Sequence, residues 1–165
     1  MVGIVIVSHS KLVAEGTAEL AHQMAPAVPI RAAGGLADGG IGTDFQRIYD
    51  AVEAVNGPDG VVVLFDMGSA MMTAEMVIES FADPNIRLAD GPLVEGTIVA
   101  AVSSIMGQSL DEILTAVRQA GEVCFPGGMR EAEESYTECA LRETEEELNI
   151  PRGEIAVFGR SDFFC

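Results

Sequence analysis

The sequence predicts an α/β fold in which a mostly parallel central sheet is flanked by helices and followed by an acidic helical C-terminal extension. Three observations support this fold class. Two continuous β-branched apolar runs, "GIVIVSH" and "VVVLFD", are typical of strands buried on both faces of a parallel sheet. Helix-like stretches alternate with the strand-like ones, which favours right-handed crossovers between parallel strands. Acidic residues then dominate one long helical pattern late in the chain.

The predicted elements follow one another with short turns between them. Strands are expected at residues 3–9 and 29–35, at 61–66 and within 83–90; helices are expected at about 12–25, 43–55, 69–81, 97–106 and 110–120. The glycine-rich segment "GGLADGGIGTD" and the segment "PLVEGT" are predicted to be loops. Four apolar residues of the first helix are expected to face the core: Leu12, Val13, Leu20 and Met24.

Charge and composition restrict the partners. The 165 residues include nine Lys and Arg against 26 Asp and Glu, a formal net charge of −17. This charge disfavours nucleic acids and anionic membranes as partners, and it favours a basic protein surface. The apolar runs are too short to span a bilayer, and the first residues do not resemble a secretory signal, so a cytoplasmic protein is expected. Cys124, Cys139 and Cys165 lack metal-ligand spacing and are expected to be free thiols.

The pattern of the chain changes near Gly121. The alternation of strands and helices stops there, and an acidic helical stretch follows, with apolar residues up to Cys165. We therefore expect one domain at residues 1–121 and an extension at residues 122–165 that is not an independent domain.

The residues most suited to chemistry come at the ends of two buried strands. His9 ends the first strand, and Asp66 follows "VVVLF". Reactive groups gather at the carboxyl ends of parallel strands, so the two side chains lie close together if these strands are neighbours. A carboxylate that accepts the Nδ1 proton fixes the imidazole tautomer and leaves Nε2 as a nucleophile for phosphorus. The alternative is a structural histidine beside an acid that only caps a helix.

A transferred phosphoryl group also needs hydrogen-bond donors around it, whereas a transfer between histidines requires no metal ion. The expected donors are the hydroxyls and turn amides at Ser8, Ser10, Gly42, Thr43, Gly68 and Ser69, with Met67 in the same loop.

Other conspicuous residues have plainer interpretations. His22 lies within a predicted amphipathic helix and is expected to be structural. Met71, Met72 and Met76 are expected in the core or at a partner contact. The glycine-rich loop matches neither a Walker A sequence nor a dinucleotide fingerprint, so nucleotide binding is not predicted for this chain.

Four motifs in order, "VIVSHS", "GIGTD", "FDMGSA" and "PLVEGT", resemble those of the mannose-type enzyme IIA family of the bacterial sugar phosphotransferase system. Within that family they are most similar to the phosphotransferase subunits of dihydroxyacetone kinases driven by phosphoenolpyruvate. The resemblance covers about residues 1–120. It implies a phosphotransferase subunit with the enzyme IIA fold, which is usually a homodimer.

The resemblance also implies roles for individual residues. His9 matches the histidine that accepts a phosphoryl group on Nε2 from the phosphocarrier HPr, and Asp66 matches the carboxylate that orients it. Gly42, Thr43, Met67, Gly68 and Ser69 match loops around the phosphoryl site. The group then passes to ADP held by the nucleotide-binding kinase subunit, and the ATP formed there phosphorylates dihydroxyacetone on a third subunit. No cofactor is expected on this chain.

Residues 128–150 resemble a second family, the Nudix hydrolases. Glu143, Glu146 and Glu147 share one helical face, where carboxylates can hold Mg²⁺ against a pyrophosphate. Asn149 and Thr144 depart from the family's pattern, and the preceding residues belong to another fold, so we expect a truncated Nudix-like extension without a metal site. An Mg²⁺-dependent nucleoside diphosphate hydrolase is the alternative function, and a non-catalytic regulatory module of the phosphotransferase system is a third hypothesis.

Overall fold

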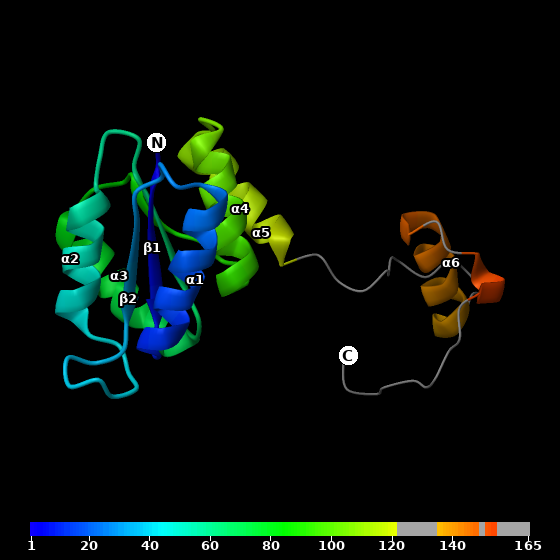
Figure 1. Cartoon of the computed structure of the whole chain (residues 1–165), viewed down its shortest axis with the longest axis horizontal. Coiled ribbons are helices and arrows are strands. Elements are labelled where there is room, and N and C mark those ends of the chain that lie inside the picture. Colours follow the sequence, from blue (N-terminus) through cyan, green and yellow to red (C-terminus); the bar gives the residue numbers. More distant parts are fainter. Residues whose placement is uncertain (122–134, 149–150, 155–165) are drawn as a thin grey trace. The chain divides into compact units, whose positions relative to one another are not determined.

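The computed structural model describes residues 1–121, 135–148 and 151–154. The chain divides into two compact units, Met1–Val123 and Cys124–Cys165. Figure 1 shows the elements of each unit in the colours of the sequence. In the described part of the chain, every strand belongs to the first unit, which therefore carries the sheet predicted for residues 1–121.

A four-stranded parallel sheet forms the centre of the first unit. Its strands, in spatial order, are β2 (Ile30–Gly34), β1 (Gly3–Ser8), β3 (Val61–Phe65) and β4 (Ile86–Leu88). β1 is an inner strand and is buried along its whole length, as its continuous apolar run predicts. The parallel pairing throughout confirms the predicted α/β fold class.

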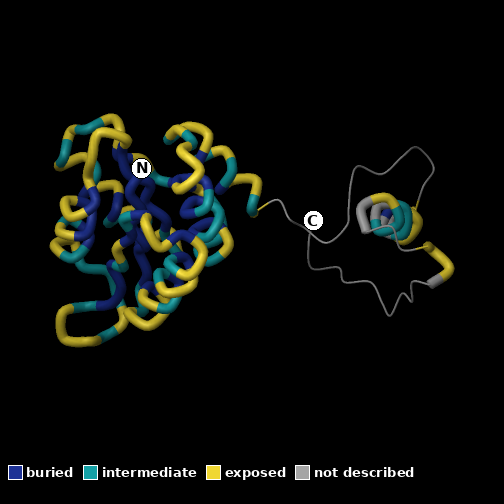
Figure 2. Tube along the Cα trace, turned by 45° about the horizontal axis from the view of Figure 1, so that its top comes forward, coloured by how far each residue is buried: buried dark blue, intermediate teal, exposed yellow. Residues whose placement is uncertain are grey.

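Helices cover both faces of the sheet (Figure 1). One face carries α1 (Lys11–Met24), α4 (Leu93–Ile105) and α5 (Leu110–Ala120), and the other carries α2 (Phe45–Val55) and α3 (Gly68–Phe81). Alternate residues of β1 serve the two cores, because successive side chains of a strand point to opposite faces. In Figure 2 the inner strands form the dark-blue buried centre of the unit.

Helix α1 buries a different face from the predicted one. Four apolar side chains predicted to face the core are exposed: Leu12, Val13, Leu20 and Met24. Three smaller residues are buried instead: Ala14, Thr17 and Ala21. The cause is the close approach of α1 to β2, since a Cβ atom added to Gly34 would lie 2.7 Å from the Ala14 Cβ. Large side chains do not fit in this space and point outward.

The segment "PLVEGT" is not a loop, contrary to the prediction. Pro92 is the N-cap of α4, and the helix begins at Leu93. The misleading residue is Gly96, which is buried inside the helix. A Cβ atom there would lie 3.1 Å from the side chains of both Leu64 and Val117. This glycine therefore lets α4 pack closely on β3 and α5 and does not end the helix.

The second unit contains α6 (Tyr136–Leu148) and the short helix η1 (Arg152–Glu154). Ser135 and Glu138 form a capping box at the start of α6, because each side chain accepts a hydrogen bond from the other's backbone N–H. Cys139 is buried, and its Sγ accepts a hydrogen bond from Arg142 at 3.7 Å. Cys124 and Cys165 lie outside the described residues, so the free thiols stay a prediction. Among the described helices, none combines the length and the apolar character that crossing a membrane requires.

Candidate active site

His9 and Asp66 meet at the carboxyl edge of the sheet. β1 and β3 are paired neighbours, with Val7 beside Phe65. The next residues along both strands therefore lie at the same edge, where β1 ends at Ser8 and β3 ends at Phe65. The strand adjacency on which the predicted histidine–carboxylate pair depends is thus present.

Asp66 holds His9 through both carboxylate oxygens. Asp66 Oδ1 lies 2.9 Å from His9 Nδ1, and Asp66 Oδ2 accepts hydrogen bonds from His9 N at 2.9 Å and from Ser8 Oγ at 2.8 Å. The His9 and Asp66 side chains are 16% and 19% exposed, so the pair is largely shielded but reachable from solvent. An ionised carboxylate only accepts hydrogen bonds, which places the imidazole proton on Nδ1 and the free lone pair on Nε2.

Two opposing effects set the pKa of Asp66. Burial raises it, while the hydrogen bonds from the His9 backbone, the His9 ring and Ser8 lower it, and the charge of His9 acts in the same direction. The net effect holds the pKa of Asp66 below its ordinary value. The carboxylate is therefore ionised at neutral pH and ready to stabilise positive charge on the ring.

The second ring nitrogen of His9 faces the start of α3. His9 Nε2 lies 2.8 Å from Ser69 Oγ, and Ser69 is exposed. The N-cap of α3 is Met67, whose side chain makes no capping hydrogen bond. The α1, α2 and α5 helices, by contrast, are capped by serine or aspartate side chains. Among the described residues, no side chain thus accepts a hydrogen bond from the first-turn amides of α3 beside the histidine.

The glycine-rich loop closes the site from the side of β2. Gly42 N donates to the His9 carbonyl at 2.9 Å, so the loop is fixed to the backbone of the histidine itself. Thr43 Oγ1 lies 3.1 Å from Thr73 Oγ1, which also donates to the Ser69 carbonyl at 3.2 Å. Because Thr73 has a single hydroxyl proton, Thr43 is the donor between the two threonines. Thr73 was not predicted from sequence, although its position one helical turn after Ser69 was a usable signal.

The serines around His9 have different surroundings. Ser8 is fully buried, and its hydroxyl is engaged with Asp66. Ser10 is the N-cap of α1, where its Oγ accepts a hydrogen bond from Val13 N at 3.4 Å. Of the predicted site residues, Ser8, Asp66 and Ser69 contact the His9 side chain or its partner Asp66, and Gly42 contacts the His9 backbone. Gly68 and the exposed Met67 lie at the start of α3, next to that network.

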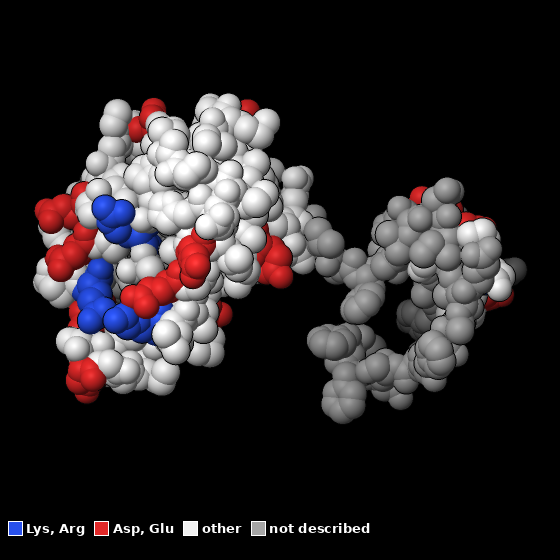
Figure 3. Space-filling view, viewed as in Figure 1, with Lys and Arg blue, Asp and Glu red and all other residues white. Residues whose placement is uncertain are grey.

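Basic side chains lie on the helices that begin near this site. Lys11 is the first residue of α1 and forms an ion pair with Glu15 at 3.7 Å, and Arg47 lies in the first turn of α2. On the face shown in Figure 3, Lys and Arg residues gather over α1, β2 and α2, with Asp and Glu residues beside them. The acidic chain thus carries a local group of positive charges on the elements that border His9.

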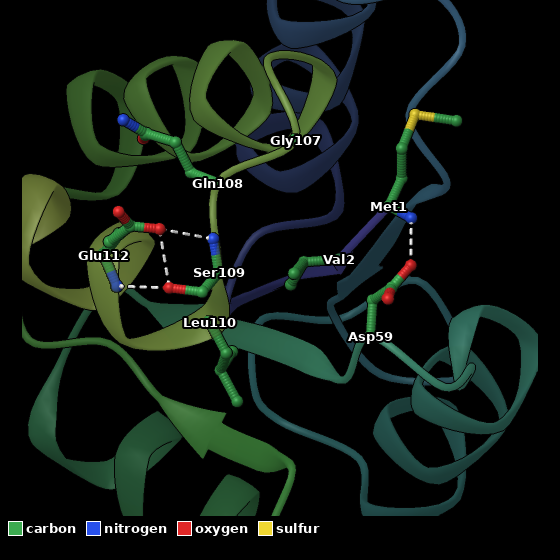
Figure 4. Close-up of a pocket in the computed structure, with 8 residues that line it drawn as sticks. All are labelled: Met1, Val2, Asp59, Gly107, Gln108, Ser109, Leu110 and Glu112. Carbon is green, nitrogen blue, oxygen red and sulfur yellow. Dashed lines mark hydrogen bonds and ion pairs between the residues drawn. The ribbon is translucent and has the colours of Figure 1, made fainter.

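A cavity of about 360 Å³ lies at the opposite, amino end of the sheet. Figure 4 shows its lining residues: Met1, Val2, Asp59, Gly107, Gln108, Ser109, Leu110 and Glu112. The Met1 ammonium group pairs with Asp59, and Ser109 and Glu112 form the capping box of α5. None of the predicted site residues lines this cavity, so it is separate from the histidine site.

The carboxylates of the Nudix-like motif are only partly described. Glu146 accepts a hydrogen bond from Arg142 at 3.2 Å within α6. The side chains of Glu143 and Glu147 lie outside the described residues. Among the described side chains, no three metal-ligating groups come together.

Comparison with known proteins gives two family matches. The family described as EIIA-man, the PTS system fructose IIA component, matches residues 3–114, and the NUDIX domain family matches residues 97–164. Residues 97–120 include most of α4 and all of α5, which pack in the same core as β1. The second match therefore begins inside the first unit. A Nudix hydrolase 3 from Caenorhabditis elegans is 49% identical over 39 residues, 24% of this chain and 16% of that protein.

Several curated relatives resemble the first unit. The phosphoryl donor subunit DhaM of the PEP-dependent dihydroxyacetone kinase of Escherichia coli (strain K12) is 42% identical over 69% of this chain, which matches 26% of that protein's length. The phosphoryl donor subunit DhaM of the PEP-dependent dihydroxyacetone kinase 1 of Listeria innocua is 40% identical over 67% of this chain and 88% of its own length. The phosphotransferase subunit DhaM of the PTS-dependent dihydroxyacetone kinase of Lactococcus lactis is 38% identical over 67% and 89%, respectively.

Two solved structures share the fold of the first unit. The protein EF1359, described as of unknown function, superposes with a TM-score of 0.65 and 29% identity over 72% of this chain and 92% of its own. A sigma-54 interaction domain protein from Enterococcus faecalis, at 19% identity and a TM-score of 0.57, shares the fold. The family match over residues 3–114 and the curated relatives show that the chain belongs to the mannose-type enzyme IIA family, the PTS system fructose IIA components.

Proposed function

We propose that this chain is a phosphohistidine carrier, the phosphoryl donor subunit of a dihydroxyacetone kinase driven by phosphoenolpyruvate. His9 accepts a phosphoryl group from HPr and passes it to ADP bound on the nucleotide-binding subunit of the kinase, so this chain needs no cofactor of its own. One observation carries the proposal: Asp66 Oδ1 lies 2.9 Å from Nδ1 of a histidine whose Nε2 faces the uncapped start of α3.

The transfer to His9 is an exchange of one phosphorus–nitrogen bond for another. The Nε2 lone pair attacks the phosphorus of the donor's phosphohistidine, the new bond forms, and the donor's imidazole leaves with the electron pair of the broken bond. The ring of His9 gains positive charge while Nδ1 keeps its proton. The Asp66 carboxylate, already ionised, stabilises that charge across the Nδ1 hydrogen bond.

The start of α3 is suited to receive the phosphoryl oxygens. Ser69 Oγ donates to Nε2 in the unphosphorylated state and turns to a phosphoryl oxygen once Nε2 is bonded to phosphorus. The amides of Gly68 and Ser69 supply further donors at the positive end of the helix dipole, whereas Ala70 N already donates to the Met67 carbonyl. Gly42 and Thr43 act by holding the neighbouring loop against His9.

The partners follow from the same proposal. Both the donor HPr and the kinase subunits must bring their reacting groups to the carboxyl edge of the sheet. The formal charge of −17 favours donors and acceptors with basic surfaces, while the Lys and Arg residues that border His9 place positive charge next to the site itself (Figure 3). As in related enzyme IIA folds, the carrier acts as a homodimer in the cytoplasm.

Incubation with phosphoenolpyruvate, enzyme I and HPr, followed by mass measurement, tests the proposal. The expected result is an acid-labile gain of one phosphoryl group that is absent from His9→Ala. Adding the two kinase subunits then leads to consumption of dihydroxyacetone, whereas a purely regulatory module becomes phosphorylated without supporting that reaction. Absence of phosphorylation in the wild-type chain refutes the proposal.

The match of residues 97–164 to the NUDIX domain favours one alternative, an Mg²⁺-dependent nucleoside diphosphate hydrolase. Its test is release of phosphate products from such compounds with Mg²⁺ present, and loss of that release in Glu146→Gln. Glu146 is an exposed residue of α6, and its hydrogen-bond partner Arg142 lies in the same helix. Hydrolysis by the wild-type chain that survives in His9→Ala assigns the activity to the second unit.

A further inference from the structure

The sequence predicts that the Ser8 hydroxyl donates a hydrogen bond to the phosphoryl group, but in the structure this hydroxyl has other partners. Ser8 is the last residue of β1 and has no solvent exposure. Its Oγ donates to Asp66 Oδ2 at 2.8 Å and accepts a hydrogen bond from Ser10 N at 3.1 Å. A hydroxyl has one proton to donate, so Ser8 cannot serve a phosphoryl oxygen while it serves Asp66.

This hydroxyl is one of two donors that fix the plane of the Asp66 carboxylate. Asp66 Oδ2 accepts from Ser8 Oγ and from His9 N, while Oδ1 faces His9 Nδ1. Two donors on Oδ2 restrict rotation about the bond that carries the carboxylate. With the backbone donor alone, the carboxylate turns more freely, and Oδ1 spends less time at the ring.

We infer that Ser8 is a positioning residue, whose buried hydroxyl holds the Asp66 carboxylate in the orientation that keeps the His9 proton on Nδ1. The inference rests on the proposed function of His9 as a phosphoryl acceptor. It also joins the site to α1, because the same Oγ accepts the hydrogen bond of Ser10 N, immediately before the helix.

The surrounding charges support this role. Burial raises the pKa of Asp66, and the hydrogen bond from Ser8 is one of the contacts that together lower it below its ordinary value. The titratable group in direct contact with Asp66 is His9. The nearby elements contribute Lys11 at the start of α1, and Asp44 and Arg47 at the start of α2. Removal of the Ser8 hydroxyl changes none of these charges, so it raises the pKa of Asp66 through the lost hydrogen bond.

The test compares two substitutions of Ser8 in the full chain with a matched control. Ser8→Ala removes the hydroxyl, and Ser8→Thr keeps it. Ser104→Ala is the control, because Ser104 is also fully buried and donates a single hydrogen bond, to the Val2 carbonyl at 2.8 Å, away from His9. If Ser8→Ala fails to fold, Ser8→Cys replaces it, since a thiol is a weak donor of similar size.

Three measurements separate positioning from a merely structural role. They are the rate of His9 phosphorylation by HPr as a function of pH, the ¹³C titration of the Asp66 carboxyl group, and the ¹⁵N spectrum of the His9 ring. We expect Ser8→Ala to slow phosphorylation about 10- to 100-fold, as outer groups that orient a carboxylate–histidine pair do. In this variant we also expect the acid limb of the rate–pH profile and the titration of the Asp66 carboxyl group to move to higher pH. The ¹⁵N spectrum of its His9 ring is expected to show less of the Nδ1–H tautomer. Ser8→Thr restores most of the rate.

Two results would overturn the inference. One is a Ser8→Ala variant that loses stability as Ser104→Ala does but keeps the wild-type titration, ring spectrum and pH profile. The other is a Ser8→Ala variant that is phosphorylated more slowly although its Asp66 titration is unchanged. That result makes Ser8 a hydrogen-bond donor to the phosphoryl group and not a positioning residue. The two spectroscopic measurements need no phosphoryl transfer, so they test the inference even if HPr fails to phosphorylate the wild-type chain, a result that would refute the proposed function alone.

Discussion

Replacement of Asp66 by asparagine is the most direct test of the histidine–carboxylate pair. The amide has one acceptor and one donor end, whereas the site offers donors to both ends: Ser8 Oγ and His9 N on one side and His9 Nδ1 on the other. When the amide oxygen of the asparagine accepts from Ser8 Oγ and His9 N, its NH₂ group faces His9 Nδ1. The ring then moves its proton to Nε2, and the nucleophilic lone pair is lost.

The size of the effect follows from charge and distance. In the proposed transfer the ring carries developing positive charge next to Asp66, with 2.9 Å between Nδ1 and Oδ1. For charge centres about 4 Å apart and an effective dielectric constant of about 20, the attraction is about 4 kcal/mol. At about 1.4 kcal/mol for each factor of ten, loss of the carboxylate slows phosphorylation of His9 about a thousandfold.

Rapid-quench measurement of phosphorylated chain, with HPr as donor, checks this estimate. Asp59→Asn is the control, because Asp59 lies at the opposite end of the sheet and pairs with the Met1 ammonium group. We expect the control to react at the wild-type rate. An Asp66→Asn variant that stays within about tenfold of wild type contradicts both the tautomer argument and the electrostatic one.

Three further predictions concern the site and its support. Ser69→Ala removes the hydroxyl 2.8 Å from His9 Nε2, so phosphorylation slows about 10- to 100-fold in the same assay, and an unchanged rate shows that this hydroxyl does not assist transfer. Gly34→Ala places a Cβ 2.6 Å from the Ser10 carbonyl oxygen and lowers the free energy of unfolding by about 1–3 kcal/mol. Gly16→Ala, with open space around the new Cβ, raises the free energy of unfolding by about 0.5–1 kcal/mol, and thermal denaturation of both variants tests these opposite signs. The pKa of Asp66 is lowered in the folded state, so its contribution to stability is complete above the unfolded pKa and is lost as pH falls below about 4. Denaturant unfolding at several pH values is expected to show a free energy of unfolding that falls less steeply toward acid pH in Asp66→Asn than in the wild type.

The strands and the central pair of the site were predictable because strong local patterns define them. The apolar runs of β1 and β3 leave no alternative to burial, and a polar residue directly after each run marks the edge of the sheet. His9 and Asp66 are therefore visible in the sequence as chemistry-bearing residues at strand ends. Their direct hydrogen bond needed one further fact, the adjacency of β1 and β3, which no local pattern encodes.

The errors arise where tertiary packing overrides local pattern. In α1, periodicity predicted a core of large apolar residues, but the space beside Gly34 accepts only side chains such as Ala14. In α4, Gly96 looked like a loop residue and is a contact point for two neighbouring elements. The role of Ser8 was missed for a related reason, since its hydroxyl is defined by a partner 58 residues away in the sequence.

The commitment of one ring nitrogen to Asp66 has a consequence for the order of events in such a carrier. Because Nδ1 is held by the carboxylate, a group can arrive and depart only through Nε2, on the side of Ser69. The proposed donor and acceptor proteins must then bind at the same side of the ring one after the other. A complex of the donor, this chain and the acceptor therefore cannot react. In the proposed carrier, the phosphorylated imidazole is reachable from solvent between the two transfers, so the lifetime of its phosphorus–nitrogen bond limits the time available for the next partner to bind.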